Sequence, residues 1–291
     1  MEGQDSDLWT DAASSEYEVN HHLDDIDPDR NLLYSINRES NYYDDNALCN
    51  TLRDRKGLSI IHFNARSLNS NFKNLEMYLS QLEIKFDVVA ITETWFTEST
   101  VTSIFNIKGY EMHYVSRNTS RGGGVALYVN TDLKCRRVEN MSLCVEDNFE
   151  CLTVELLLEG AKNVIISCLY RKPGTKLDDF IDKLEELYCH IKTNKVLYIC
   201  GDFNIDLLKH DSHAPTEHFL EAMFSLGLFP LITKPSRVTD HSATLIDNIF
   251  TNESKHENIS GIILNGVSDH LPVFTWYGCK IKKTIRSIYS V

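Results

Sequence analysis

The sequence predicts an α/β fold in which two packed β-sheets are flanked by helices. The first observation is a series of short apolar segments of strand length between residues 58 and 277. The second is that some of these segments are separated by helical periodicity, whereas others follow one another through short, hairpin-like links. The third is size: 291 residues, 42% of them hydrophobic, supply enough apolar material for one large domain core or two small ones.

The expected strands are apolar runs bounded by polar or turn-forming residues. In chain order they are Leu58–Asn64, Phe86–Ile91, Tyr110–Val115, Gly124–Val129, Cys151–Leu158, Val164–Tyr170, Val196–Cys200, Ile259–Leu264 and Val273–Tyr277. The expected helices have apolar residues three or four positions apart, as at Phe72, Leu75 and Leu79. They are Asn71–Leu82, Leu177–Ile191 and Thr216–Leu226.

The two ends of the chain differ from this body in composition. Residues 1–57 contain 14 acidic and 5 basic residues, so they carry −9 of the net charge of −13. Because they include few apolar residues, we expect an acidic, mostly disordered linker followed by a domain over residues 58–278. Tyr42-Tyr43-Asp44-Asp45 resembles a polymerase aspartate pair, but a solvated linker explains it. Residues 279–291 form a short basic tail.

Charge and hydropathy exclude several classes of function. The net charge of −13 argues against a protein that coats nucleic acid by bulk electrostatics. No run approaches the roughly 18 to 20 apolar residues of a membrane span, and the acidic N-terminus is unlike a secretory signal. The eight cysteines form no Cys-x-x-Cys pair and several lie in apolar runs, which indicates a reducing, intracellular protein. We expect no membrane partner.

Polar side chains able to bind a metal or a phosphate lie at the ends of five predicted strands. Each one alone is explained by a turn or a helix cap, but five in one chain indicate a site on a rigid scaffold. The residues concerned are Asn64, Glu93, Tyr170, Asp202, Asn204, Asp269 and His270.

These segments also carry a resemblance to a known family. Phe63-Asn64-Ala65-Arg66-Ser67, Ile91-Thr92-Glu93-Thr94-Trp95, Gly201-Asp202-Phe203-Asn204, Ile246-Asp247-Asn248-Ile249-Phe250 and Ser268-Asp269-His270-Leu271-Pro272 occur in this order. Together they resemble the endonuclease/exonuclease/phosphatase superfamily, in particular the endonuclease domain of non-LTR (LINE-type) retrotransposons, over residues 58 to 277. The resemblance implies a four-layer α/β sandwich, with two mostly antiparallel sheets packed face to face and helices outside.

The resemblance also implies roles for individual residues. Glu93 would hold Mg²⁺, with Mn²⁺ as the alternative, and Asn64 would lie beside it as a metal or phosphate contact. Asp202 would orient and deprotonate the attacking water, and Asn204 would hydrogen-bond the scissile phosphate. Tyr170 would contact the phosphate or assist the leaving group.

Three further residues would act on the charge that develops at phosphorus. His270, held in its charged form by Asp269, would stabilise that charge. Asp247 would brace the histidine side of the site. Leu245 and Asn248 flank Asp247 where cellular repair members often carry a basic residue and a tyrosine, so specificity for abasic sites is not implied.

The implied activity is Mg²⁺-dependent nicking of one DNA strand, which would give a 3′-hydroxyl primer for reverse transcription. The implied partners are duplex DNA, contacted through its backbone and minor groove, together with element RNA and a reverse transcriptase supplied elsewhere. A DNA substrate requires nuclear access. The alternatives are a phosphatase or phospholipid phosphodiesterase of the same superfamily, and a catalytically inactive relic.

Two other patterns have simpler explanations. Gly122-Gly123-Gly124 lacks the Lys-Ser/Thr of a nucleotide-binding loop and leads into a strand, so we expect a hairpin turn. His210, His213 and His218 lie around Pro215 in a polar segment, which predicts a surface loop and a helix start rather than a metal site.

Overall fold

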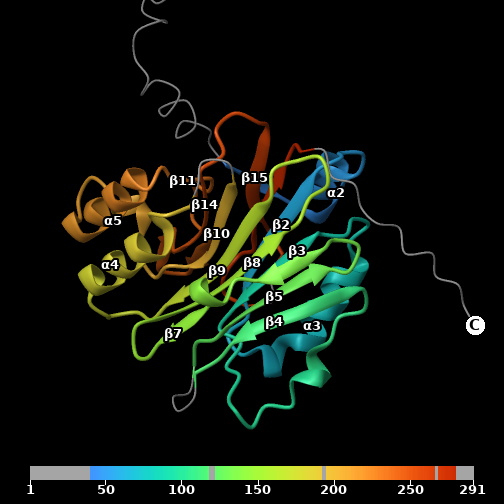
Figure 1. Ribbon diagram of the computed structural model, residues 1–291, viewed down its shortest axis with the longest axis horizontal. Helices are drawn as coiled ribbons and strands as arrows, with labels where there is room; N and C mark the ends of the chain where they lie inside the picture. Colours follow the sequence, from blue (N-terminus) through green and yellow to red (C-terminus); the bar gives the residue numbers. More distant parts are fainter. Residues whose placement is uncertain (1–39, 118–121, 192–194, 266–267, 280–291) are drawn as a thin grey trace, which may run out of the picture.

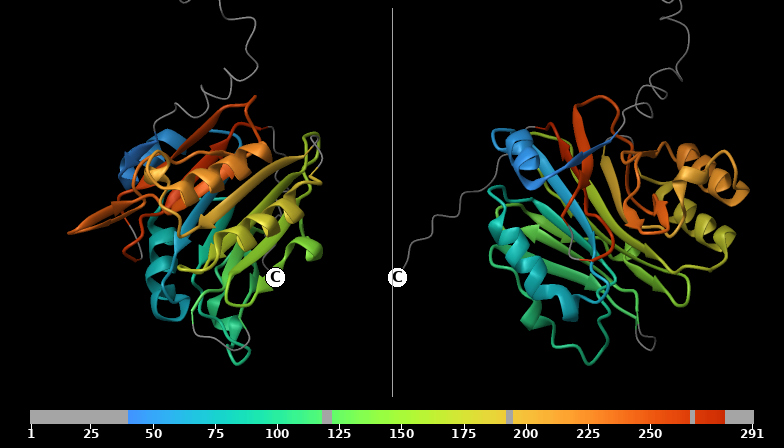
Figure 2. Two further views of the ribbon diagram at one scale, coloured as in Figure 1. Left: turned by 90° about the vertical axis from the view of Figure 1, so that its left-hand side faces the viewer. Right: turned by 180° about the vertical axis from the view of Figure 1, so that it is seen from behind.

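Two β-sheets pack face to face, and helices cover the outer face of each sheet (Figures 1 and 2). The computed structural model describes residues 40–117, 122–191, 195–265 and 268–279. Helices α2 and α3 lie against the first sheet, and α4 and α5 lie against the second (Figure 2). The predicted four-layer α/β sandwich is therefore confirmed.

The first sheet has the strand order β1-β15-β16-β2-β3-β5-β4. Only the β1–β15 and β2–β3 pairs are parallel. Its strands are β1 (Asn41–Tyr43), β2 (Leu58–Asn64), β3 (Val88–Thr92), β4 (Tyr110–Val115), β5 (Val125–Asn130), β15 (Asn258–Ile263) and β16 (Val273–Tyr277).

The second sheet has the order β11-β14-β10-β9-β8-β6, with β7 also paired to β8. Here β9 and β10 are parallel and the other pairs are antiparallel. Its strands are β6 (Cys135–Arg137), β7 (Leu143–Val145), β8 (Phe149–Leu156), β9 (Val164–Arg171), β10 (Val196–Asp202), β11 (Phe229–Pro230) and β14 (Asp247–Thr251). A separate hairpin consists of β12 (Arg237–Thr239) and β13 (Ser242–Thr244).

The helices begin where local chemistry favours a start. They are α2 (Asp45–Leu52), α3 (Leu68–Gln81), α4 (Leu177–Tyr188) and α5 (Ala214–Ser225), with short 3₁₀ turns at Thr102–Phe105, Glu139–Met141 and Leu207–Lys209. The side chains of Asp44 and Ser67 accept backbone N–H bonds at the starts of α2 and α3. None of the helices in these described ranges is long and apolar enough to cross a membrane.

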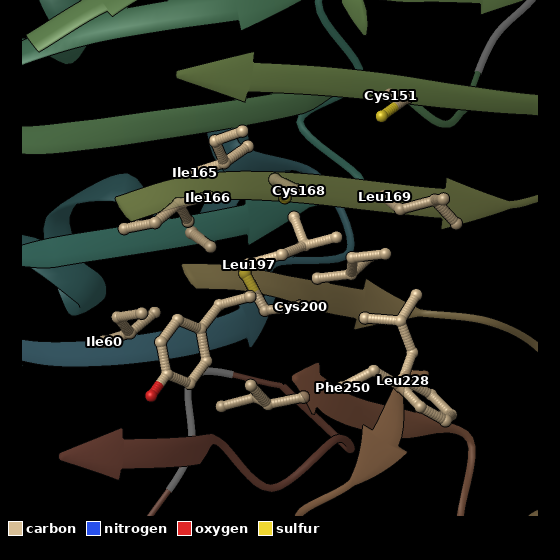
Figure 3. Close-up of a cluster of buried hydrophobic side chains, with 14 of the residues drawn as sticks. Ile60, Cys151, Ile165, Ile166, Cys168, Leu169, Leu197, Cys200, Leu228 and Phe250 are labelled. Atoms are coloured by element: carbon tan, nitrogen blue, oxygen red, sulfur yellow. The ribbon is translucent and has the colours of Figure 1, made fainter. Parts of the chain in front are cut away.

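Alternation along the strands divides the core in two. In β2, Ile60 belongs to the cluster between the sheets, whereas Ile61 and Phe63 belong to the cluster under α2 and α3. Figure 3 shows Ile60 in one buried cluster with residues of the second sheet such as Cys200 and Ile166. Because side chains alternate, His62 and Asn64 lie on the same face of β2 as Ile60. This face carries the polar side chains of His62 and Asn64 into the space between the sheets.

The prediction of a mostly disordered segment over residues 1–57 is wrong for residues 40–57. Asn41–Tyr43 pairs with β15, the Tyr43 ring packs against Phe274, and Asp44 caps α2. The Tyr-Tyr-Asp-Asp run is therefore an edge strand and a helix start, and not a solvated linker. Residues 1–39 and the tail beyond residue 279 lie outside the described residues.

Most element predictions agree with the structure to within a few residues. The helix expected from Asn71 starts at Leu68, because Ser67 caps it, and the helix expected to reach Ile191 ends at Tyr188. The omissions include the helix α2 and, as the longest of the missed strands, β14, a buried strand whose Asp-Asn start masks its apolar character. The glycine run joins β4 to β5 as expected of a hairpin link. At Gly124, whose φ is +81°, an added Cβ would clash with the Thr94 hydroxyl.

Candidate active site

The polar strand ends meet at one end of the two-sheet sandwich. Asn64 closes β2, and Glu93 follows the adjacent parallel strand β3. Across the second sheet, Tyr170, Asp202 and Asp247 are direct cross-strand neighbours in β9, β10 and β14. Asp247 begins its strand where the other two end theirs, because β14 runs antiparallel to β10.

Asn64 joins the two sheets at this end. Its amide nitrogen donates to Glu93 Oε1 at 3.0 Å and to Asp202 Oδ2 at 2.8 Å. Its amide oxygen accepts the backbone N–H of Arg66 at 3.0 Å. Ser268 adds a hydrogen bond of 2.6 Å from its hydroxyl to the Asn64 carbonyl. The two acidic groups predicted to act on metal and on water are thus held by one side chain.

Unusual backbone conformations hold several of these residues. Glu93 has φ of +56° and Asn204 has φ of +49°, in the left-handed region that L residues with a Cβ seldom adopt. The Glu93 carboxylate accepts a hydrogen bond from Trp95 Nε1 at 3.1 Å, and its backbone carbonyl accepts one from the N–H of Ser67. Such conformations persist only where surrounding contacts hold them.

Asp202, Asp247 and His270 form a buried cluster whose potential ligand atoms all lie within 4.8 Å of one another. His270 Nδ1 lies 2.8 Å from Asp247 Oδ2, and the Ser236 hydroxyl donates to the same oxygen at 2.8 Å. Burial lowers the pKa of His270, but the charge of Asp247 and the hydrogen bond to it outweigh burial and raise the pKa to about 9. His270 is therefore a cation at neutral pH.

The environment of Asp202 favours the neutral form of its side chain, whereas that of His270 favours the charged form. Burial and the nearby charge of Asp247 raise the pKa of Asp202 well above the ordinary value, against the smaller opposing effect of His270. One of its carboxylate oxygens accepts the backbone N–H of Asn204 at 3.0 Å, and the other accepts the Asn64 amide. The carboxylate is thus oriented at both oxygens, with a proton affinity above that of an exposed aspartate.

The predicted clamp between Asp269 and His270 is wrong, because the hydrogen-bond partner of His270 is Asp247. The Asp269 carboxylate instead accepts hydrogen bonds from Arg66 at 2.8 Å and from Arg237 at 2.8 and 3.0 Å. Burial raises the pKa of Asp269, but the two arginines outweigh it and lower the pKa to about 2. Asp269 therefore connects the segment after β2 to strand β12, and its charge helps to raise the pKa of His270.

Asn204 and Tyr170 both lie beside Asp202. The Asn204 amide donates to the Arg171 carbonyl at 2.7 Å. Burial, followed by the charges of Glu93 and Asp202, raises the pKa of Tyr170, so its hydroxyl stays protonated and can donate. Tyr170 is the cross-strand neighbour of Asp202, so the Tyr170 hydroxyl and the Asp202 carboxylate lie on the same face of the sheet.

Sequence reasoning assigned no functional role to two other groups at this end. Arg117 and Glu150 form a buried ion pair, and the Arg117 guanidinium lies 5.7 Å from the centroid of the Tyr170 ring. Nothing local in the sequence relates residues 33 positions apart. His62 lies between the sheets with 1% of its surface exposed, and burial lowers its pKa to about 4. The sequence feature that could have identified His62 is its position as a polar residue within the apolar run of β2.

The chemistry of the donor set fits a hard divalent cation at Glu93. Its carboxylate, partly exposed beside the Asn64 amide, offers oxygen ligands of the kind that Mg²⁺ prefers. The remaining ligands of such an ion are ordinarily water and substrate phosphate oxygens. Glu93 is therefore the residue that would offer a carboxylate to the metal, whereas Asn64 turns its amide nitrogen toward that carboxylate and its amide oxygen toward the N–H of Arg66.

Comparisons with known proteins agree with this geometry. The sequence matches the endonuclease/exonuclease/phosphatase family over residues 61–270. Among solved structures, the endonuclease domain of TRAS1, a telomere-specific non-LTR retrotransposon, has 14% sequence identity and a TM-score of 0.59, and the match covers 76% of this chain and 98% of that one. The AP endonuclease LMAP from Leishmania major has 13% identity and a TM-score of 0.67, with coverage of 85% and 98%.

A third similar structure, the 3′ phosphatase NExo from Neisseria bound to product DNA hairpin, has 14% identity and a TM-score of 0.56, with coverage of 76% and 99%. Curated proteins show no significant match. Likeness at these identities shows the fold, whereas the family match spans more than half of the chain. This chain therefore belongs to the endonuclease/exonuclease/phosphatase family, whose members hydrolyse phosphoester bonds.

Proposed function

We propose that this protein is a Mg²⁺-dependent endonuclease that nicks one strand of duplex DNA, as the endonuclease of a non-LTR retrotransposon does. The observation that carries the proposal is the hydrogen-bonded connection of Glu93 and Asp202 through Asn64, next to the buried Asp247–His270 pair. Phosphodiester hydrolysis requires a base for water and a cation for the phosphoryl oxygens. These two pairs of residues supply both within one end of the fold.

Each residue has a role that its environment supports. Asp202, with its raised proton affinity, accepts a proton from the attacking water. His270 donates its Nδ1 proton in a hydrogen bond to Asp247, which leaves its Nε2–H free to donate to a phosphoryl oxygen. Tyr170 and Asn204 act as neutral donors to the phosphate. A divalent ion at Glu93 and Asn64 would neutralise charge on the phosphate oxygens.

The test is conversion of supercoiled plasmid to open circle by the purified chain, with Mg²⁺ and with EDTA. His270→Ala and Asp202→Ala should each remove the Mg²⁺-dependent nicking without unfolding the chain. His218→Ala and Asp211→Ala are the matched controls, because both side chains are exposed. Nicking that persists in EDTA, or equal nicking by Asp202→Ala, would refute the proposal.

The same experiment separates the alternatives within the family. A 3′-phosphorylated oligonucleotide, a phosphoinositide and sphingomyelin should be poor substrates beside plasmid DNA. Turnover of one of these without nicking would assign a phosphatase or phospholipid phosphodiesterase activity. No turnover of any of them by the folded, Mg²⁺-loaded chain would indicate a relic. Partnership with element RNA and a reverse transcriptase stays a prediction.

A further inference from the structure

His62 is buried beside the candidate active site and has no role in the chemistry described so far. It lies on the inward face of β2, two residues before Asn64, with 1% of its surface exposed. Polar side chains in such a position ordinarily satisfy their hydrogen-bonding groups, because burial without a partner costs about 1 to 3 kcal/mol. The neighbours of each ring nitrogen therefore indicate what the side chain does.

The two ring nitrogens face different groups. Nε2 lies 3.0 Å from the hydroxyl oxygen of Thr92, in the adjacent strand β3. Nδ1 lies 3.9 Å from Asp247 Oδ1, and neither of these buried atoms has a hydrogen-bond partner among the described residues. The other oxygen of Asp247 is the one that accepts from His270 and Ser236. Asp247 is thus positioned between two histidines.

We propose that His62 is a positioning residue that orients the Asp247 carboxylate, and through it the His270 ring, from the opposite side of the cluster. A carboxylate offers only lone pairs, so it attracts Nδ1 only when this nitrogen carries the ring proton. Donation from the Thr92 hydroxyl to Nε2 selects that form of the neutral ring. The separation of 3.9 Å is longer than a hydrogen bond, so the proposed bond requires the carboxylate to turn toward His62.

A core histidine that only fills space between the sheets is the competing explanation. It predicts that any side chain of similar volume is tolerated once the protein folds. The positioning role predicts that only a side chain with a donor near Nδ1 preserves the geometry of His270. The effect on turnover rests on the proposed nicking activity, whereas the geometry can be observed without it.

Three substitutions of His62 separate the two explanations. His62→Asn keeps an amide donor close to the Nδ1 position, His62→Gln keeps a polar group toward Thr92, and His62→Leu keeps only volume. We expect His62→Leu and His62→Gln to lower kcat for nicking by about tenfold, the value of one hydrogen bond to a charged group, with KM unchanged. His62→Asn should retain most of the activity. Equal activity in all three folded variants would overturn the proposal.

A double-mutant cycle tests whether His62 acts through Asp247. In an Asp247→Asn background, where kcat is already reduced, His62→Leu should cause less than about a twofold further loss, because the residue it acts on has been changed. Losses that multiply would show that His62 acts independently, which contradicts the proposal. Thermal unfolding of every variant checks that each one is folded under the conditions in which the kcat values are compared. Should His62→Leu fail to fold, Thr92→Val removes the hydroxyl that selects the ring form.

Nitrogen-15 NMR of the histidine rings gives a readout that does not require activity. The wild-type protein should show His62 with its proton on Nδ1, and His62→Leu should shift the Nδ1 proton resonance of His270. These results without nicking would support the positioning role while refuting the proposed function. A wild-type ring with its proton on Nε2, or a His270 resonance that does not move in His62→Leu, would overturn the positioning role.

Discussion

Substitution of Asp247 by asparagine should remove the charge of His270 at neutral and mildly basic pH. The difference between a pKa of about 9 and the ordinary 6.5 corresponds to about 3 kcal/mol of preference for the charged form. Burial is the largest effect and acts in the other direction, against the smaller effects of Asp202 and Asp269, so the pKa of His270 in Asp247→Asn should fall toward 6.5. At pH 8 the protonated fraction then drops from about 0.9 to about 0.03, roughly thirtyfold.

The assay is an NMR titration of the His270 ring, with the resonance assigned by its loss in His270→Gln. In the wild type the nicking rate should fall as the pH rises through about 9. In Asp247→Asn the same fall should occur near pH 6.5. Glu257→Gln, which changes an exposed carboxylate, is the control and should leave both profiles in place. A His270 midpoint that stays near 9 in Asp247→Asn would show that Asp247 does not hold the histidine in its charged form.

The same pair makes a prediction for stability. The folded-state pKa of His270 lies above its unfolded value, so its contribution is complete below pH 6.5 and is lost as pH rises through about 9. The free energy of unfolding should therefore fall by about 3 kcal/mol over that window in the wild type. The Asp247→Asn protein should lack this fall, which urea unfolding at each pH would measure.

Three further predictions concern groups around the site. Glu150→Ala leaves the buried Arg117 without its ion-pair partner and should lower the free energy of unfolding by about 3 to 5 kcal/mol in urea titrations; a loss below about 1 would contradict it. Gly201→Ala drives a Cβ into the Leu169 carbonyl oxygen and should destabilise the chain by at least about 2 kcal/mol by the same measurement; wild-type stability would show that the two strands can separate. Asp269, whose pKa is about 2, stabilises the fold above its ordinary pKa of 3.8, and this contribution is lost as pH falls through about 2. Asp269→Asn should therefore be less stable than the wild type at about pH 5 and equal to it below about pH 2, as followed by thermal unfolding.

Local periodicity was enough to predict the elements whose pattern is regular. Tyr110–Val115 and Val273–Tyr277 form strands with the predicted bounds, because apolar alternation is a property of the segment itself. The strand at Asp247–Thr251 was missed, since its first two residues are polar although both are buried. The helix Asp45–Leu52 was missed because its few apolar residues lie in an acidic stretch.

The sequence by itself determined which polar residues follow or end the strands, because such positions are local features of the chain. Only the tertiary structure decided which of these residues lie together. Adjacency in the chain suggested Asp269 as the partner of His270. The structure instead pairs His270, which precedes β16 of the first sheet, with Asp247 of β14 in the second sheet, 23 positions away in the chain. His62 likewise reaches Asp247 only because the two sheets pack face to face. Hydrogen bonds of this kind depend on strand register and sheet packing, which contacts between distant segments establish.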